Sequence, residues 1–235
     1  MREIVLDTET TGLDPAQGHR LVEVGCVELL NRIPTGATFH VYLDPERDVP
    51  AEAFAIHGLS TEFLKAQKRF AEIADDFLAF IGDAPLVIHN ANFDHAFLCA
   101  ELKRVERGLI ARERLIDTLF LARRKHSVGP YSLDALCARY GIDNSRRTKH
   151  GALLDAEILA EVYVELIGAR QAQFGLAERA QSRGRDSSGG AARRERAVPL
   201  APRITDADRE AHRDFIATLG ANALWQQYLP ESLSR

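Results

Sequence analysis

Cysteine is scarce in this sequence, and the positions of its three cysteines exclude both a disulfide framework and a zinc or redox site. Cys26, Cys99 and Cys137 are odd in number and lie far apart, each within an apolar segment. A disulfide framework is built from an even set, and zinc or redox sites place two cysteines a few residues apart. We therefore expect three free, buried thiols.

Long apolar runs are lacking as well. No segment approaches the roughly 20 apolar residues that span a membrane, and the first residues show neither a basic leader nor a small-residue cleavage site. We therefore expect a cytoplasmic protein without a membrane partner. The chain has 235 residues, of which 46% are hydrophobic, which suffices for one medium-sized domain and a smaller segment.

An excess of positive charge is missing from the larger part of the chain. Residues 1–176 carry 20 Lys and Arg against 26 Asp and Glu, a net charge of −6, whereas residues 177–235 carry 10 against 8, a net charge of +2. An acidic domain does not bind phosphates by its bulk charge. If this domain handles nucleic acid, we expect it to use metal ions and local basic patches.

Large apolar side chains are absent between residues 177 and 197. Such a segment cannot bury enough apolar surface to offset the entropy of ordering it, which predicts a mobile linker. After it, Thr205 and Asp208 have the spacing of a capping box and predict a helix that runs to Leu219. Residues 198–235 cannot sustain a core alone, so we expect them to fold against a partner. The helix would present an apolar stripe of Ala211, Phe215 and Leu219, with Trp225 just beyond it.

The first part of the chain reads as strands and the middle part as alternating strands and helices. Residues 2–6, 20–31 and 37–43 are rich in Val, Leu and aromatics and are separated by turn-forming residues, including 31–36, which predicts an antiparallel meander. The later pattern predicts an α/β fold, a mixed sheet flanked by helices. Short strands are expected at 86–89 and 115–117, and helices at 70–81, 93–106, 118–125, 132–140 and 152–167.

Two acids at the end of the first strand are the first candidate site. Asp7 and Glu9 would project from the same side of an extended backbone, because strand side chains alternate between faces. Two carboxylates on one edge repel each other unless a cation lies between them, and oxygen ligands favour Mg²⁺ or Mn²⁺. An Asp-x-Glu pair also arises by chance, so the assignment depends on other acids that converge on it.

Two further segments can supply those acids. Asp94 follows the buried strand at 86–89 and would lie in the first turn of the next helix, at the carboxyl edge of the sheet. Such an acid can also be only a partner of the helix dipole. His150 and Asp155 can meet one site only if His150 precedes its helix, an entry that Gly151 would permit. His150 can also be a surface residue of a basic turn.

Asp7, Glu9, Asp94, His150 and Asp155, in this order and context, resemble the active-site set of the DEDD exonucleases of the histidine subclass. Within that family, the sequence is similar to the proofreading subunits of bacterial DNA polymerase III over about residues 3–176, and more weakly in the tail. The resemblance implies a ribonuclease H-like fold with five strands and the 3′ to 5′ removal of mismatched nucleotides from DNA. The segments that carry it are DTETTG, VIHNANFD, SLDALCARYGIDNSRRTKHGALLDA and ILAEVY.

The family also implies two divalent metal ions, Mg²⁺ or Mn²⁺, a pair suited to phosphodiester hydrolysis. By this resemblance, Asp7 would bridge both ions, Glu9 and Asp155 would complete the ion on the nucleophile side, and Asp94 would support the second ion through water. His150 is the member of the set that can change its protonation near neutral pH, so we expect it to be the general base.

The resemblance further implies contacts with a single-stranded or frayed 3′ end. We expect Phe93 and Leu13 to stack on or wedge the last base, which is a sequence-tolerant interaction. Arg146, Arg147 and Lys149 are candidates for phosphate contacts or for a solvated basic loop. The positions that match nucleotide-holding residues of the family are Thr10, Gly12, Leu13, Ile56, His57, Asn90 and Phe93.

Two segments point to protein partners. Residues 171–176 match the Gln-x-x-apolar-x-apolar pattern of peptides that bind the bacterial sliding clamp beta, with Gln171, Phe174 and Leu176 as its anchors. The tail loosely resembles the family's segment for the polymerase alpha subunit, with Phe215, Leu219 and Trp225 as anchors. A small theta-like accessory subunit is a further partner that the family implies.

The predicted organisation is an exonuclease domain at 1–176, a linker at 177–197 and a polymerase-binding segment at 198–235, in a protein of the replication complex. Two other interpretations remain open. A stand-alone RNA-trimming exonuclease of the same subclass would account for the first domain but not for the linker and aromatic tail. A non-catalytic tether between polymerase and clamp would account for the tail but not for the five site residues.

Overall fold

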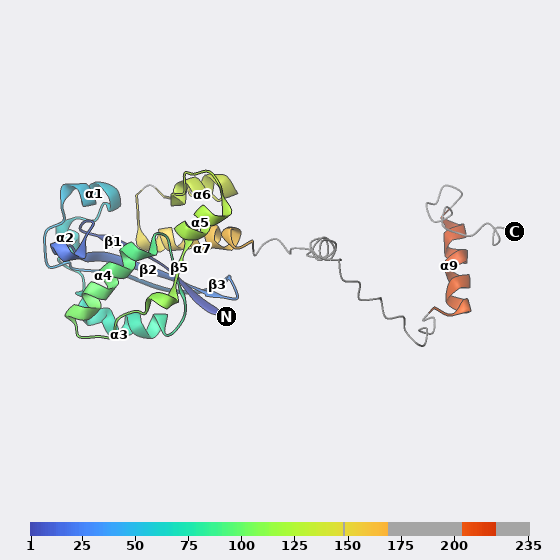
Figure 1. Ribbon diagram of the computed structural model, residues 1–235, viewed down its shortest axis with the longest axis horizontal. Coiled ribbons are helices and arrows are strands. Elements are labelled where there is room, and N and C mark those ends of the chain that lie inside the picture. Colours follow the sequence, from blue (N-terminus) through green and yellow to red (C-terminus); the bar gives the residue numbers. More distant parts are fainter. Residues whose placement is uncertain (148, 169–203, 220–235) are drawn as a thin grey trace, which may run out of the picture. The chain divides into compact units, whose positions relative to one another are not determined.

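The chain divides into two units, Met1–Phe174 and Gly175–Arg235. The predicted linker, the clamp-binding segment 171–176 and Trp225 lie outside the residues described. None of the described helices is long and apolar enough to cross a membrane. The computed structural model describes residues 1–147, 149–168 and 204–219 (Figure 1).

The first unit is built on a five-stranded sheet whose strands lie in the order β3-β2-β1-β4-β5. β1 pairs antiparallel with β2, and β2 with β3, whereas β4 is parallel to β1 and β5 is parallel to β4. The predicted mixed sheet is therefore confirmed. The strands are β1 Arg2–Thr10, β2 Leu21–Leu30, β3 Ile33–Tyr42, β4 Leu86–Ile88 and β5 Leu115–Asp117.

The connection between β2 and β3 is shorter than the turn-forming residues 31–36 suggest. Asn31 and Arg32 alone close the hairpin, with φ angles of 51° and 68°. Two residues with positive φ form the turn whose twist matches that of the flanking strands. β3 therefore begins at Ile33, and the prediction that it begins at residue 37 is wrong.

Most helices lie where the apolar periodicity places them, and α3 and α5 match their predicted bounds. The predictions do not include α1 and α2, because these helices are short and α1 buries only Ala53 and His57, too few for a visible stripe. Short 3-10 turns occur at Pro15–Gln17 and Arg112–Arg114. The helices are α1 Ala51–His57, α2 Thr61–Leu64, α3 Phe70–Ile81, α4 Ala91–Arg104, α5 Thr118–Lys125, α6 Leu133–Tyr140, α7 Ala152–Leu166 and α9 Asp206–Thr218.

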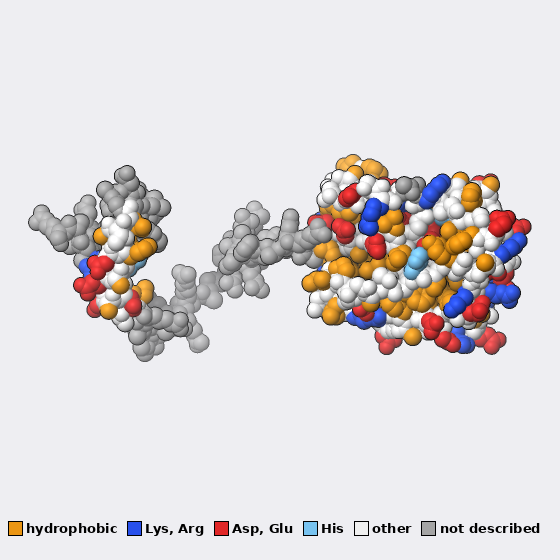
Figure 2. All heavy atoms as spheres, turned by 180° about the vertical axis from the view of Figure 1, so that it is seen from behind, with side chains coloured by type: hydrophobic (Ala, Val, Ile, Leu, Met, Phe, Trp, Pro, Cys, Tyr) orange, Lys and Arg blue, Asp and Glu red, His pale blue; other side chains and the backbone are white. Residues whose placement is uncertain are grey.

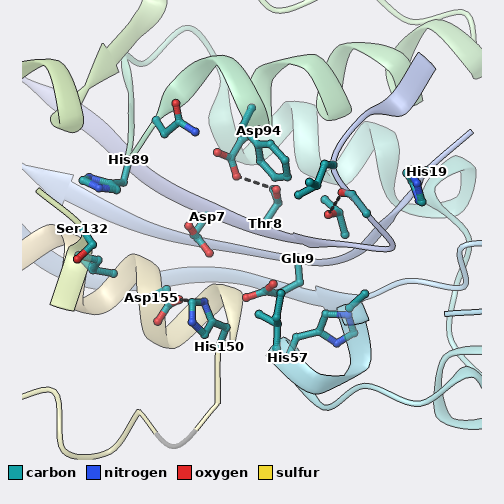
Figure 3. Close-up of a pocket in the computed structure, with 18 of the residues that line it drawn as sticks. Asp7, Thr8, Glu9, His19, His57, His89, Asp94, Ser132, His150 and Asp155 are labelled. Atoms are coloured by element: carbon teal, nitrogen blue, oxygen red, sulfur yellow. Dashed lines mark hydrogen bonds and ion pairs between the residues drawn. The ribbon is translucent and has the colours of Figure 1, made fainter. Parts of the chain in front are cut away.

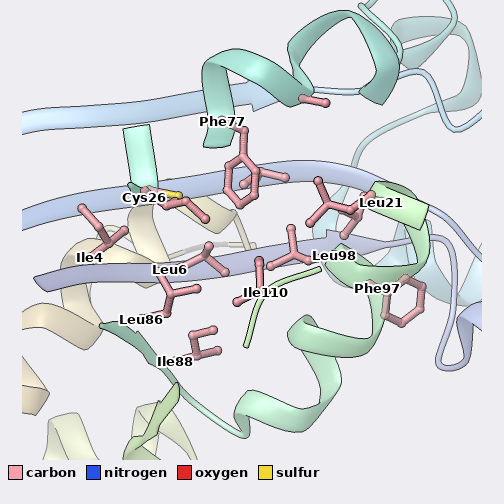
Figure 4. Close-up of a cluster of buried hydrophobic side chains, with 14 of the residues drawn as sticks. Ile4, Leu6, Leu21, Cys26, Phe77, Leu86, Ile88, Phe97, Leu98 and Ile110 are labelled. Carbon is pink, nitrogen blue, oxygen red and sulfur yellow. The ribbon is translucent and has the colours of Figure 1, made fainter. Parts of the chain in front are cut away.

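Helices cover both faces of the sheet. α3 and α4 lie on one face, where Leu6, Phe77 and Leu98 are completely buried (Figure 4). α7 lies on the other face, and α5 and α6 pack against α7. Each fully buried side chain of this kind contributes about 1.5–3 kcal/mol over an exposed one. The three cysteines are free thiols, as expected, although Cys99 is only partly buried.

Alternation along β1 decides which side chains reach which layer. Val5 packs in the cluster beneath α7, and Leu6 packs in the cluster beneath α3 and α4. Because strand side chains alternate, Asp7 and Glu9 share the α7 side with Val5, while Thr8 lies on the α4 side. The strand thus directs two acids toward the helix that carries a third.

Gly25 allows α7 to approach the sheet closely beside these acids. It pairs with Asp7 in the β1–β2 ladder. A Cβ atom at position 25 would lie 2.2 Å from the backbone nitrogen of Leu153 and 2.3 Å from the carbonyl carbon of Ala152. The first turn of α7 therefore rests on bare backbone, which brings Asp155 next to β1.

The described part of the second unit is the helix α9, which begins where the capping box predicts. The Thr205 side chain accepts a hydrogen bond from the Asp208 amide, and the Asp208 carboxylate accepts one from the Thr205 amide. Phe215 and Leu219 are 61% and 49% exposed. The predicted helix is confirmed, and two of its predicted anchors are accessible.

Replacing Gly25 by alanine is expected to lower the free energy of unfolding by about 1–3 kcal/mol or more, because α7 must move to admit a methyl group. Urea unfolding of the Gly25→Ala variant measures this change. Gly108→Ala is the matched control, because an added Cβ there meets no atom within 4 Å. Equal stability of the two variants would contradict the close approach.

Candidate active site

A cleft of about 1120 Å³ opens at the carboxyl ends of β1 and β4. Its walls come from β1, from the first turn of α4, from α1 and from the start of α7. The labelled acids and His150 point into a common space (Figure 3). All five predicted catalytic residues line this cleft: Asp7, Glu9, Asp94, His150 and Asp155.

Asp7, which is half-buried, and Glu9, which is buried, lie on one side of β1. Burial, and then the charge of Asp94, raise the pKa of Asp7. Burial, and then the charge of Glu23 directly across on β2, raise the pKa of Glu9 to about 8. Carboxyl groups this close in a low dielectric resist simultaneous ionisation. A cation between them would remove that resistance.

Asp94 reaches the site from the first turn of α4 and is 3% exposed. The Thr8 hydroxyl donates a hydrogen bond of 2.7 Å to its Oδ1 atom. Burial raises the pKa of Asp94 to about 7, and the hydrogen bond from Thr8 opposes that rise. β1 therefore carries two acids on one side and fixes a third from its other side.

His150 and Asp155 flank the start of α7. His150 precedes the helix, as its spacing from Asp155 requires, and its Nδ1 atom lies 3.7 Å from Asp155 Oδ2. Gly151 is the N-cap residue of α7, with an extended backbone (φ of −151°) and open space around it. One ligand atom each from Glu9, His150 and Asp155 lie within 4.8 Å of one another.

Partial burial, and then the nearby Arg147 guanidinium, lower the pKa of His150. The imidazole is therefore neutral near pH 7, the form in which it can accept a proton. Its side chain is 48% exposed, so solvent reaches the ring. These properties fit a general base at the mouth of the acid cluster.

Arg147 lies inside the cleft rather than on a solvated loop. Its side chain is 8% exposed, and it forks onto both oxygens of Asp155, with an Nη2 to Oδ2 distance of 2.7 Å. Asp134 and His150 accept further hydrogen bonds from it. Lys149 donates to the carbonyl oxygen of Ala55. Arg147 and Lys149 thus have protein partners at the positions where phosphate contacts were expected.

The seven predicted nucleotide-binding residues all line the same cleft. The Thr10 hydroxyl donates to the Gly12 carbonyl oxygen at 2.6 Å, which closes the turn after β1. Leu13 is 83% exposed and Ile56 is 50% exposed, so apolar surface is available at the rim. Phe93 also packs against Phe97, with ring centroids 5.1 Å apart. The remaining members are His57, on α1, and Asn90, which precedes α4.

Several cleft residues are missing from the sequence predictions. Thr8 could have been inferred from alternation, because it lies between two acids on the opposite face. Ser132 and Asp134 lie in one of the segments that carry the resemblance, but no role was assigned to them, and α6 with its cap brings them to the cleft. Glu23, behind Glu9 on β2, was not predicted either. These residues can be recognised only in the three-dimensional structure, where strands and helices that are distant in sequence lie side by side.

The described residues on the face of the molecule shown in Figure 2 form no patch of basic side chains of the kind that binds nucleic acid. On the face shown in Figure 2, Lys and Arg side chains are scattered among Asp and Glu side chains rather than gathered in one patch. This agrees with the acidic composition of residues 1–176. On this face, affinity for a nucleic-acid end would not come from a basic patch.

The donor set of the cleft suits divalent cations. It consists of carboxylate oxygens with one imidazole nearby, which are ligands of Mg²⁺ and Mn²⁺. Burial raises the pKa values of Asp7, Glu9 and Asp94, and the charges of neighbouring carboxylates of the set raise those of Asp7 and Glu9 further, so ionising this set without a cation is costly. The residues present therefore fit the metal ions that the resemblance implies.

Comparison with known proteins places these features in a family. The family described as Exonuclease matches residues 4–163. The DNA polymerase III subunit epsilon of Rickettsia felis is 47% identical over 93% of this chain and 97% of its own length. The epsilon subunit of Rickettsia conorii is 56% identical over 76% and 79%, and that of Escherichia coli is 43% identical over 96% and 97%.

Solved structures agree in fold. The nuclease domain of 3′hExo, a DEDDh family member bound to rAMP, superposes with a TM-score of 0.62 at 17% identity, over 72% of this chain and 92% of that one. Exonuclease X in complex with 5′ overhanging duplex DNA gives a TM-score of 0.55 at 25% identity, over 71% and 91%. The ribonuclease H-like exonuclease fold is thereby confirmed.

The metal-free protein is expected to lose stability as the pH rises from 5 to 9. The pKa of Glu9 is raised from 4.5 to about 8, so the folded state holds a proton that the unfolded state releases in this window. The stabilisation of the folded state by this proton is fully present below about pH 4.5 and is lost as the pH rises past about 8. Thermal unfolding across this range measures the loss, and added Mg²⁺ should restore stability at the alkaline end.

The Glu9→Gln variant should show a smaller loss over the same pH range, because it carries no titrating group at position 9. Glu62→Gln, at an exposed position, is the control. Identical pH profiles for the wild type and Glu9→Gln would contradict the raised pKa of Glu9.

Proposed function

Since the chain belongs to the exonuclease family, as one of its DNA polymerase III epsilon subunits, we propose that its five clustered residues excise mismatched 3′-terminal nucleotides from DNA during replication. The protein is a 3′ to 5′ exonuclease of the DEDDh class, a hydrolase. The catalytic assignment rests on one observation, which is that five residues converge on one cleft: Asp7, Glu9, Asp94, His150 and Asp155.

Exonucleases of this class depend on divalent metal ions. We assign two ions, Mg²⁺ or Mn²⁺, to Asp7, Glu9, Asp94 and Asp155. When bound, such ions activate water and stabilise the charge that develops on the attacking and leaving oxygens. Asp7 would be the shared ligand, Glu9 and Asp155 would complete the ion on the nucleophile side, and Asp94 would support the second ion through water. The grouping of Glu9, Asp155 and His150 within 4.8 Å supports this division.

His150 is the proposed general base. Its lowered pKa keeps it neutral at physiological pH, so it can take the proton of the attacking water. The carboxylates cannot perform this task efficiently while they hold cations. His150 is also accessible to solvent, unlike the buried acids, which allows the proton to leave the site afterwards.

The rim of the cleft would hold the terminal nucleotide. Leu13 and Ile56 offer exposed apolar surface to a base, a contact that tolerates any sequence. The turn closed by Thr10 and Gly12 would lie against the sugar, and His57, Asn90 and Phe93 complete the set. Phe93 already packs against Phe97 with the two rings tilted, so we propose that it supports the base with its remaining surface.

Two segments are proposed to bind the replication machinery. The named relatives are polymerase III subunits, which supports association with the polymerase. We assign the alpha subunit to residues 198–235, through Phe215, Leu219 and Trp225, and the beta clamp to residues 171–176, through Gln171, Phe174 and Leu176. The exposure of Phe215 and Leu219 on α9 supports the first assignment. A theta-like subunit is a further proposed partner.

Degradation of a 3′-mismatched DNA primer in the presence of Mg²⁺ tests the catalytic assignment. Asp7→Asn should lower the turnover at least about a hundredfold, because a shared metal ligand is lost. Asp76→Asn, an exposed acid on α3, should leave turnover unchanged. Full activity of Asp7→Asn would refute the assignment. Faster cleavage of a matched RNA would favour the RNA-trimming interpretation, and inactivity of the wild type would favour the tether.

Two variants test the assignments to the alpha subunit and to the beta clamp separately. Removal of residues 198–235 should abolish co-purification with the polymerase alpha subunit and preserve nuclease turnover, because the site lies entirely in the first unit. Gln171→Ala with Phe174→Ala should weaken clamp binding and preserve alpha binding. Pull-downs with each partner measure both effects. A loss of turnover on truncation, or unchanged clamp binding, would refute the corresponding assignment.

A further inference from the structure

Arg147 contacts both Asp155 and His150, which the proposed function treats as a metal ligand and as the general base. Its Nε and Nη2 atoms bond both oxygens of Asp155, and Nη2 also donates to His150 Nδ1 at 2.9 Å. Its Nη1 atom donates to both oxygens of Asp134 at 3.0 and 2.9 Å. One buried guanidinium therefore neutralises Asp155 from the place where a cation ligated by Asp155 would lie.

The charge of Arg147 also reaches the acids of β1. It lowers the pKa of Asp7 and of Glu9, against burial and the neighbouring carboxylates, which raise both values. Its fork on Asp155 is a bidentate, charge-assisted contact, among the stronger kinds of hydrogen bond. Asp155, 3% exposed, would otherwise be a costly buried charge in the metal-free protein.

The contact with His150 has a chemical consequence. A guanidinium can only donate, so Nδ1 of His150 accepts, and the neutral ring then carries its proton on Nε2. Neither ring nitrogen has a free lone pair for the proton of an attacking water. His150 can therefore act as a base only after Arg147 has withdrawn from it.

Asp134 provides a place to which Arg147 can withdraw. It lies on α6 at the side of the cleft, with a side chain that is 58% exposed, and it already accepts two hydrogen bonds from Nη1. Asn144 also donates to it, at 2.9 Å, which fixes the carboxylate. The guanidinium can keep this anchor while it releases Asp155 and His150.

We propose that Arg147 is a positioning residue that substitutes for a cation on Asp155 and restrains His150 in the metal-free enzyme, and that metal loading moves its guanidinium off these two residues onto Asp134, the partner that it keeps. This inference rests on the proposed function, in which Asp155 binds metal and His150 is the base. It makes activation of the base conditional on metal binding. It also explains how the buried Asp155 is neutralised before metal arrives.

Calorimetric titration of the metal-stripped, full-length protein with Mn²⁺ tests the proposal. Arg147→Gln removes the competitor and should bind Mn²⁺ at least about tenfold more tightly than the wild type, the value of one charge-assisted hydrogen bond. Asp134→Asn removes the alternative anchor and should bind it a few-fold more weakly. Arg146→Gln, at a neighbouring arginine that is 68% exposed, should match the wild type.

Thermal unfolding gives a second readout that does not depend on catalysis. Without metal, Arg147→Gln should unfold at a lower temperature than the wild type, and saturating Mn²⁺ should raise its melting temperature by more. Opposite shifts in Mn²⁺ affinity for Arg147→Gln and Asp134→Asn support the proposal, because general damage to the site would weaken both.

Unchanged or weaker Mn²⁺ binding by Arg147→Gln would overturn the proposal while leaving the metal site itself in place. If Arg147→Gln does not fold, Asp134→Asn decides: weaker binding supports the transfer, and unchanged binding overturns it. If the wild type binds no Mn²⁺, the proposed function fails at its metal assignment, and the role of Arg147 fails with it.

Discussion

Repulsion among buried carboxyl groups is the constraint around which this site is organised. Asp7, Glu9, Asp94 and Asp155 line one cleft, where Glu9, Asp94 and Asp155 are buried and Asp7 is half-buried, and Glu23 pairs with Glu9 across the β1–β2 ladder. A fold that collects acids in a low dielectric must hold protons, a basic side chain or metal ions there. Burial raises the pKa values of Glu9 and Asp94 to about 8 and about 7, which favours bound protons, and Arg147 supplies the basic side chain. Catalysis by this family uses the third.

The fold supplies this cluster through simple geometric means. Alternation along β1 directs Asp7 and Glu9 to one side and Thr8 to the other. The parallel pairing of β1 with β4 brings the first turn of α4 to the same edge of the sheet. The absence of a side chain at Gly25 lets α7 rest on β2, so that Asp155 meets the acids of β1. Two of these features join segments that are distant in sequence, and the site forms where all three coincide.

Much of this could be read from the sequence, because the decisive signals were periodic or carried by motifs. The strands, the helices at 70–81 and 118–125, and the five converging residues follow from alternation, apolar spacing and family resemblance. The tight hairpin at Asn31 and the short helix α1 did not, since they depend on turn geometry and on packing rather than on a long pattern. The placement of Arg147 also escaped, because its partners lie on α6 and α7.

Proton release on metal binding tests the central claim most directly. Titration with Mn²⁺ at pH 7, in buffers of different ionisation enthalpy, counts the protons that leave the protein. Because burial raises the pKa values of Glu9 and Asp94 to about 8 and about 7, a net release of protons is expected as the carboxyl groups become ligands. Metal binding with no proton release would contradict it.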